Sequence, residues 1–239
     1  MPEDGTIALK PGNLSFEEAA SLSFGAMTAL PFLRDKAGIK AGDSVLVVGA
    51  SGAVGTAAVQ IARHFGAEVT GVTSTSNLEL VAALGAHRVI DYTKTDFATT
   101  GNNWDIIIDT TGTVSFDRCD KSLRPGGRLV AIQGSFAQTL GIGKPSKASG
   151  KTVIAGYVPA RPEDLRYIAR LASTGEVKPV VDRVYPLEEA AQAHAYVDTG
   201  RKRGSVVLTV GNRQWETTAR LRTRTSKDEP PHLIPVAVR

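Results

Sequence analysis

Short apolar runs alternate along this chain with segments whose apolar residues recur at helical spacing. Residues 44–50, SVLVVGA, form a continuous run rich in β-branched residues, which is typical of a strand buried on both faces of a parallel sheet. Residues 53–64 then carry apolar side chains at helical spacing, and residues 68–73 form a second apolar run. The same rhythm predicts further strands at 88–92, 104–109, 128–134 and 151–158. This order predicts an α/β fold with a doubly wound parallel sheet.

Helix signals flank these strands. Ser15 and Glu18 form a capping box that begins a helix, which Pro31 interrupts or restarts. A second box, Ser76 to Glu79, predicts the start of a helix that stops at Gly85. Further helical segments are predicted at 114–122, 162–174 and 187–198, and two more strands at 178–185 and 205–210.

A glycine-rich turn, GASGAVG at residues 49–55, joins the first strand to the helix after it. Such a turn in a Rossmann fold needs a tight bend, a bare backbone at the pyrophosphate and a small residue where helix meets strand. Ala50, Gly52 and Gly55 supply these, with Ala50 replacing the first glycine of the usual fingerprint. Helix amides and the positive end of the helix dipole then face the phosphates. We predict a dinucleotide site formed by Ala50, Ser51, Gly52, Ala53, Val54 and Gly55.

The end of the second strand sets the choice of cofactor. An acidic residue there accepts the ribose hydroxyls of NAD and repels the extra phosphate of NADP. This chain has Thr73-Ser-Thr-Ser-Asn77 instead, so hydroxyls such as those of Thr73, Ser74 and Ser76 can donate to a 2′-phosphate. We therefore expect NADP(H) to be preferred over NAD(H).

Composition narrows the remaining function classes. The net charge is +4, of which residues 212–239 carry +3, so the body is nearly neutral and no nucleic-acid surface is expected. We expect those 28 residues to be a disordered tail. No apolar stretch of about 18 residues is present and the start lacks the features of a signal peptide, so we expect no membrane span and a cytoplasmic location.

Several motifs together resemble the medium-chain dehydrogenase/reductase superfamily, in its zinc-free branch of quinone-oxidoreductase-like enzymes. They span residues 10–210 and are LSFEEAA at 14–20, MTAL at 27–30, VLVVGASGAVG at 45–55, LGA at 84–86, VIDY at 89–92, PGG at 125–127 and GRKRG at 200–204. The resemblance implies that Thr28 approaches the nicotinamide, that Ser74 and Tyr92 contact the adenosine phosphate and that Gly134 lies near the nicotinamide ribose. It also implies an NADPH-dependent reductase of quinones, enones or similar carbonyl compounds, and a homodimer.

The chain departs from that family pattern. Members often carry Arg or Lys in place of Ser76, and Lys in place of Ser205. They also begin with a catalytic domain of about a hundred residues, and the resemblance leads us to expect that Met1 lies near the end of that domain. We expect four parts: residues 1–40 as a lead-in and helix, 41–176 as the dinucleotide-binding domain, 177–211 as a return segment of the catalytic domain, and 212–239 as the tail.

Candidate catalytic groups are few. A catalytic zinc needs three protein ligands, and one cysteine with four scattered histidines offers no such cluster, so we expect no zinc. Thr28 is the one candidate for orienting a substrate, and its alternative is a helix residue bonded to an upstream carbonyl. Thr111, after the strand at 104–109, either lines the cofactor crevice or belongs to a capped turn. Two functions remain open: an oxidoreductase, or an inactive remnant that binds NADP(H).

Overall fold

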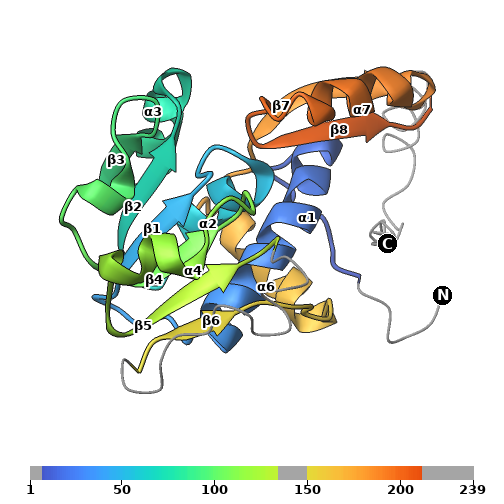
Figure 1. Cartoon of the computed structure of the whole chain (residues 1–239). Coiled ribbons are helices and arrows are strands. Elements are labelled where there is room, and N and C mark those ends of the chain that lie inside the picture. The colour runs from blue at the N-terminus through green and yellow to red at the C-terminus, as the bar shows by residue number, and fades with distance from the viewer. Residues whose placement is uncertain (1–6, 134–149, 212–239) are drawn as a thin grey trace.

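The computed structural model describes residues 7–133 and 150–211, and its main feature is a six-stranded parallel sheet (Figure 1). The strand order is β3-β2-β1-β4-β5-β6. The strands are β1 Ser44–Val48, β2 Glu68–Thr73, β3 Arg88–Asp91, β4 Trp104–Asp109, β5 Leu123–Ala131 and β6 Thr152–Ile154. This is the order of a doubly wound Rossmann sheet, so the predicted fold class is confirmed.

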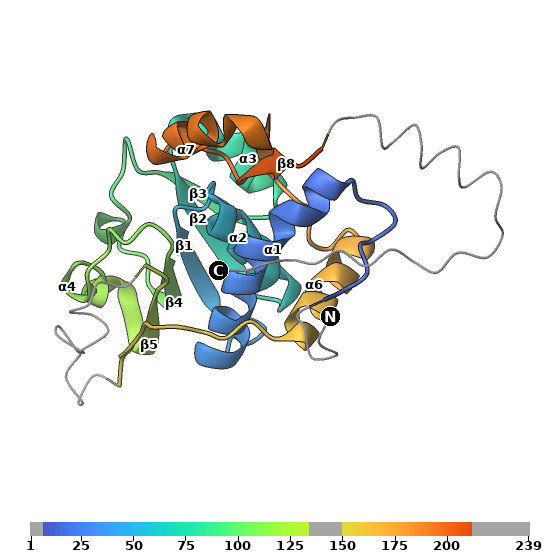
Figure 2. The same cartoon turned by 90° about the vertical axis from the view of Figure 1, so that its right-hand side faces the viewer.

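Helices cover both faces of this sheet. Figure 2 shows α1, α2 and α6 on one side and α4 on the other. The α-helices are α1 Phe16–Pro31, α2 Ala53–His64, α3 Leu78–Ala83, α4 Phe116–Cys119, α6 Pro162–Ser173 and α7 Ala190–Asp198. Short helical turns lie at Phe32–Lys36, Thr75–Asn77, Phe97–Thr99, Asp120–Ser122 and Leu187–Glu189.

Each central strand divides its side chains between two cores. In β1, Val45 and Val47 belong to the core under α1, α2 and α6, whereas Leu46 and Val48 belong to the core on the opposite face. The first three of these side chains are fully buried. Burial on both faces explains why β1 is a continuous apolar run rather than an alternating one.

The predicted capping box at the start of α1 is confirmed. The amide of Glu18 donates to Ser15 Oγ at 3.1 Å, and the amide of Ser15 donates to Glu18 Oε2 at 2.8 Å. Pro31 is the last residue of α1, and a short π-helix follows it directly.

The second predicted box, at Ser76, is wrong. Residues Thr75–Asn77 form a 3₁₀ turn, and α3 begins at Leu78 with Asn77 as its N-cap and no side-chain cap. Ser76 Oγ instead lies 3.4 Å from Ser74 Oγ. The hydroxyls of Ser74 and Ser76 therefore lie near each other, and Ser76 does not cap the helix.

Two strand boundaries differ most from prediction. β5 begins five residues earlier than expected, because Leu123 already pairs with Trp104 before an irregularity in the register. β6 ends at Ile154, four residues early, and Gly156 adopts a left-handed φ of 111° just beyond it.

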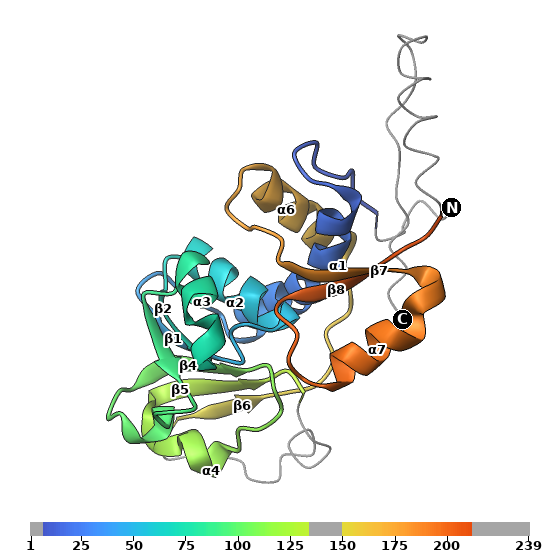
Figure 3. The ribbon, with the colours of Figure 1, turned by 90° about the horizontal axis from the view of Figure 1, so that it is seen from above.

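A second, two-stranded sheet lies across α1, away from the large sheet (Figure 3). Its parallel strands are β7 Val181–Pro186 and β8 Ser205–Thr209, connected through α7. Ser205 Oγ donates to the carbonyl of Ser21 in α1 at 3.1 Å. This contact ties the end of the described chain to its first helix.

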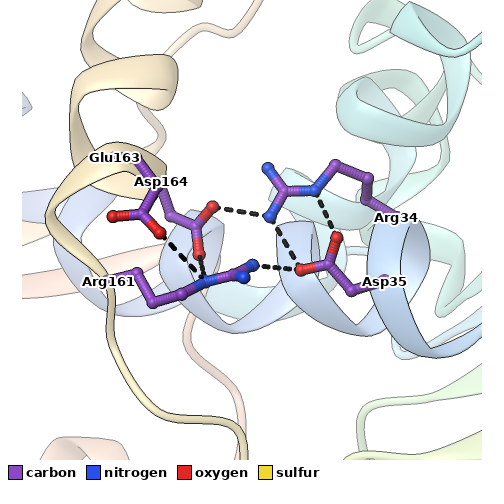
Figure 4. A network of polar contacts seen from close by, with 5 residues as sticks. All are labelled: Arg34, Asp35, Arg161, Glu163 and Asp164. Atoms are coloured by element: carbon purple, nitrogen blue, oxygen red, sulfur yellow. Dashed lines mark hydrogen bonds and ion pairs between the residues drawn. The ribbon is translucent and has the colours of Figure 1, made fainter.

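An ion network joins the start of α6 to the short π-helix that follows α1 (Figure 4). Asp164 is 1% exposed and accepts from Arg34 Nη2 at 2.6 Å and from Arg161 Nε at 3.0 Å. Asp35 pairs with both arginines in turn, and Arg34 holds the pKa of its carboxyl below its usual value. The buried carboxylate is thus compensated by two guanidinium groups.

Candidate functional site

The glycine turn bends at Gly49, one residue before the position assigned from the sequence. Gly49 has a left-handed φ of 78°, and a Cβ there would lie 2.5 Å from Thr111 and 2.6 Å from Thr110. Gly55 packs the helix against this bend, because a Cβ on it would lie 2.0 Å from the carbonyl oxygen of Gly49. Ala50 is fully buried beneath the turn.

The start of α2 presents an uncapped helix end. Gly52 is the N-cap and provides no side-chain hydrogen bond. Its carbonyl accepts the amide of Thr56 at 2.8 Å, so the helix proper begins here. The first-turn amides of a helix have no intrahelical acceptor, and together with the helix dipole they favour an anion. A Cβ on Gly52 would meet only the Gly49 carbonyl, at 3.5 Å, so the approach to this end is open.

A cleft of about 1240 Å³ lies over this helix end, at the carboxyl ends of β1, β2 and β4. Most of the predicted cofactor residues line it. They are Ser51, Gly52, Ala53, Val54, Thr73, Ser74, Ser76, Tyr92 and Thr111. Ala50, Gly55 and Thr28 lie outside its lining, and Gly134 lies outside the described residues.

A chain of polar side chains joins the glycine turn to the end of β2. Thr73 Oγ1 donates to Ser51 Oγ at 2.9 Å. Asn77 Nδ2 donates to Ser74 Oγ at 3.1 Å and to Ser51 Oγ at 3.3 Å. Asn77 is 8% exposed and lines the cleft, although no sequence motif singles it out from the rest of its loop. It holds the two loops of the cleft together.

The loop after β2 contains no acidic residue, but the fold places an acidic residue of β3, Asp91, next to this loop. Asp91, at the end of β3, accepts from Thr75 Oγ1 at 2.5 Å and from Thr93 Oγ1 at 2.7 Å. These hydrogen bonds, Thr75 first, lower the pKa of the Asp91 carboxyl. Neither Asp91 nor Thr75 lines the cleft, so the carboxylate orders the loop while Ser74 and Ser76 face the open space.

The loop after β4 is both a capped turn and part of the cleft. Asp109 Oδ1 accepts from the amide and hydroxyl of Thr111, at 2.9 and 2.7 Å, and Oδ2 accepts the amide of Val114 at 2.9 Å. Asp109 is 1% exposed, so its carboxylate serves this turn and not the solvent. Thr111 nevertheless lines the cleft.

A distant segment closes the cleft on the α2 side. Residues 200–203, which we name the basic strap, line it. The following residue, Gly204, donates its amide to the carbonyl of Ser51 at 2.7 Å and forms an isolated bridge with Gly52. Gly204 must be glycine there, since its φ is 69° and a Cβ would lie 2.2 Å from the carbonyl oxygen of Val180. Spacing in the sequence could not reveal this contact.

A second cavity, of about 940 Å³, differs in chemistry. It lies between α1, α6 and the small sheet, and its lining is mostly aliphatic, with Leu22, Ile168 and Val207 among its members. Lys10 and Glu17 are the charged residues in this lining. This mostly aliphatic lining does not resemble a phosphate site.

In the structure, Thr28 makes the contact of the alternative interpretation, that of a helix residue bonded to an upstream carbonyl. Its hydroxyl donates to the carbonyl of Phe24, one turn upstream, at 2.8 Å. The part of the chain that the structure describes holds no group of three or more His, Cys, Asp or Glu residues able to hold a metal ion. The absence of zinc stays a prediction.

His64 and Cys119, two further titratable residues, have contacts that indicate a structural role. His64 lies 2.7 Å from both Glu176 and the hydroxyl of Tyr167, and so joins α2 to α6. Burial raises the pKa of the Cys119 thiol to about 12, which makes it a poor nucleophile. Among the described residues, no helix is long and apolar enough to cross a bilayer.

Comparisons with known proteins agree with this geometry. A model of the family described as zinc-binding dehydrogenase matches residues 84–208. The chain is 36% identical over 210 residues to a 2-methylene-furan-3-one reductase of Solanum lycopersicum, and 33% identical over 210 residues to a chloroplastic NADPH-dependent alkenal/one oxidoreductase of Arabidopsis thaliana. Each alignment covers 86% of this chain and 50% of the relative, so the chain spans about half the length of these two proteins.

A solved structure gives the same result. A crystal structure described as an NAD-dependent alcohol dehydrogenase superposes with a TM-score of 0.75 at 35% identity. The match covers 85% of this chain and 62% of that one. One of these relatives is named for NADPH and this structure for NAD, so the similarity supports a nicotinamide cofactor without selecting between the two.

Proposed function

Because this chain belongs to the zinc-binding dehydrogenase family, within the medium-chain dehydrogenase/reductase superfamily, we propose that its cleft binds a nicotinamide dinucleotide for hydride transfer. The uncapped first turn of α2 at Gly52 is the observation that carries the proposal. It lies beside β1, where the strand order of the sheet reverses, which is where doubly wound sheets bind dinucleotides. The substrate class is a small carbonyl compound, enone or quinone.

The residues present fit the cofactor. The bare backbone at Gly52 and the amides of Ala53 and Val54 would hold the pyrophosphate. Ser74, Ser76 and Tyr92 would contact the adenosine ribose and its phosphate, and Thr111 would line the path toward the nicotinamide. When bound, the cofactor supplies or accepts the hydride, while these residues bind and orient it.

We propose that NADP(H) is preferred over NAD(H). The residues of the Thr73 to Asn77 loop that line the cleft carry hydroxyl and amide groups and no carboxylate. Asp91 directs its carboxylate to Thr75 and Thr93, behind that lining. A 2′-phosphate would therefore meet donors in this loop and no direct repulsion.

Catalysis is proposed to proceed by positioning, without zinc and without a dedicated acid. The acidic residue that lines the cleft, Asp96, is paired with Arg118 at 3.1 Å. With that carboxylate engaged in an ion pair, binding of the cofactor without turnover is the second candidate function. Thr28 stays the candidate for an orienting hydroxyl.

The test is oxidation of NADPH and NADH in the presence of a panel of quinones, enones and alkenals, with binding measured in parallel by calorimetry. The control is Gly52→Asp, which places a carboxylate where the pyrophosphate would sit but is itself a favourable N-cap. We expect the wild type to bind NADPH and the variant to fold with binding lost. Binding without oxidation of any panel member would support the second candidate, and no binding at all would refute both.

A further inference from the structure

The apolar cavity between α1, α6 and the small sheet leaves large aliphatic side chains exposed. Its volume is about 940 Å³, and aliphatic side chains make up most of its lining. Leu9 and Val210 of this lining are 54% and 75% exposed. Contiguous apolar surface of this kind marks a place where another segment or molecule binds. An occupant of this cavity should itself be apolar.

The end of β8 forms one wall of the cavity. Val207, Leu208 and Thr209 of β8 line it, and so do the next two residues, Val210 and Gly211. Side chains of consecutive strand residues point to opposite faces, so the cavity follows the edge of the strand and not one face alone. β8 pairs with β7 along one edge, and among residues 7–133 and 150–211 no third strand joins this sheet. An extended segment can pair with such an open edge while its side chains enter the cavity.

The sequence that follows Gly211 carries an apolar segment of this kind. Residues 212–239 lie outside the described residues, and their sequence divides into two parts. Residues 212–232 contain eight charged side chains, whereas residues 233–238, LIPVAV, are all apolar. We name residues 233–238 the apolar segment. Pro235 favours extended backbone at the residue before it, and a proline is tolerated in an edge strand.

The chain between the cavity and the apolar segment is long enough for the two to meet. Gly211 itself lines the cavity, so the connecting residues 212–232 start at its wall. These 21 residues span at most about 70 Å when extended, and about 25 Å on average as a flexible coil. Such a tether gives the apolar segment an effective concentration of about a millimolar at the cavity. Docking on its own chain is therefore favoured over docking on a second copy at lower protein concentrations.

We propose that residues 233–238 dock in the apolar cavity of their own chain, as an extended segment beside the end of β8. Their aliphatic side chains cover Leu9 and Val210 and contact Leu22 and Ile168 of the lining. Burial of this apolar surface supplies the free energy of docking. The inference does not rest on the proposed function, because none of the described residues that line this cavity lines the cofactor cleft.

The experiment compares hydrogen–deuterium exchange of the full chain with that of three variants. The first carries Ile234→Asp and Val236→Asp, which place two charges in the apolar segment. Its matched control carries Thr223→Asp and Thr225→Asp, the same charges at the same spacing outside that segment. The third is Ala20→Arg, which places a charge in the cavity lining from an exposed position of α1. Binding of the dye ANS reports exposed apolar surface, and thermal unfolding checks that each fold persists.

We expect the amides of residues 207–211 to exchange about tenfold more slowly in the wild type and the matched control than in the other two variants. Those two variants should also bind more ANS than the wild type. Equal exchange in the wild type and the variant with a charged apolar segment would overturn the proposal. Dye binding by the wild type as strong as that of both variants would overturn it too, since the cavity would then be open. Protection that rises with protein concentration would overturn it in favour of a second copy of the chain.

Discussion

The large sheet and the small sheet are built from similar β-branched runs but reach different degrees of burial. In β4 of the large sheet, Ile106, Ile107 and Ile108 are all fully buried, because helices cover both faces. In β7 of the small sheet, Val184 is 46% exposed. The large sheet carries its own two cores, whereas the small sheet depends on α1 and still presents apolar surface. Stability and binding should therefore both concentrate in the large sheet.

The largest expected effect is in the core of the large sheet. Ile107→Ala removes a fully buried side chain and should lower the free energy of unfolding by about 2–5 kcal/mol. Val184→Ala in the small sheet should cost less than about 0.5 kcal/mol, because the side chain is already half exposed. Urea unfolding of both variants measures the contrast. Equal losses would show that the two sheets are one cooperative core.

The ion network of Figure 4 should come next. Asp164→Asn keeps the shape of the buried side chain but leaves Asp35 as the carboxylate that Arg34 and Arg161 share, at a cost of about 1.5–3 kcal/mol. Glu163→Gln alters a 64% exposed partner 3.6 Å from Arg161 and should change stability by less than about 0.5 kcal/mol. Chemical unfolding of the pair checks this, and similar values would mean that the network is merely surface charge.

A third effect links packing to binding. Gly55→Ala places a Cβ against the Gly49 carbonyl and should cost about 1–3 kcal/mol, with loss of dinucleotide binding as the turn shifts. Gly12→Ala, where a Cβ meets nothing within 4 Å, is the control and should leave both properties intact. Unfolding and NADPH calorimetry on the same samples are the measurements. Full binding by the first variant would mean that the turn does not hold the cofactor.

The smallest effect concerns pH. The folded-state pKa of Asp91 is lowered, so its contribution to stability is present above the unfolded value of about 3.8 and is lost as pH falls below it. Asp91→Asn should remove this contribution to the loss of stability at low pH, and should loosen the loop after β2 that contains Thr75. Thermal unfolding from pH 7 to pH 3 compares the two proteins. Identical acid profiles would show that Asp91 does not order the loop.

The sequence predicted the elements of the fold better than the contacts within the cleft. The strands β1, β2 and β4 are apolar runs whose burial on both faces is visible residue by residue. The fingerprint, aligned by spacing, predicts the tight bend at Ala50, whereas the left-handed φ lies at Gly49, because φ is a property of the backbone. In the sequence His64 is one of four scattered histidines without a recognisable partner, and the fold gives it partners 103 and 112 residues away.

The residues in and behind the cleft that the sequence does not single out share one cause. Sheet order and the return of the chain to the turn bring Asn77 against Ser51, Asp91 against Thr75 and Lys202 into the cleft lining. Neither propensity nor periodicity encodes such contacts. A motif alone locates the phosphate-binding backbone, and only the fold shows which side chains surround it.

Hydrogen–deuterium exchange with and without NADPH tests the central claim most directly, because it reports on both regions of the comparison at once. If the cleft holds the cofactor, NADPH should slow exchange of the amides at residues 52–55, 73–77 and 200–204. The apolar cavity under the small sheet, at Ile168 and Val207, should not change. Protection confined to that cavity, or no protection of the glycine turn at saturating NADPH, would contradict the account.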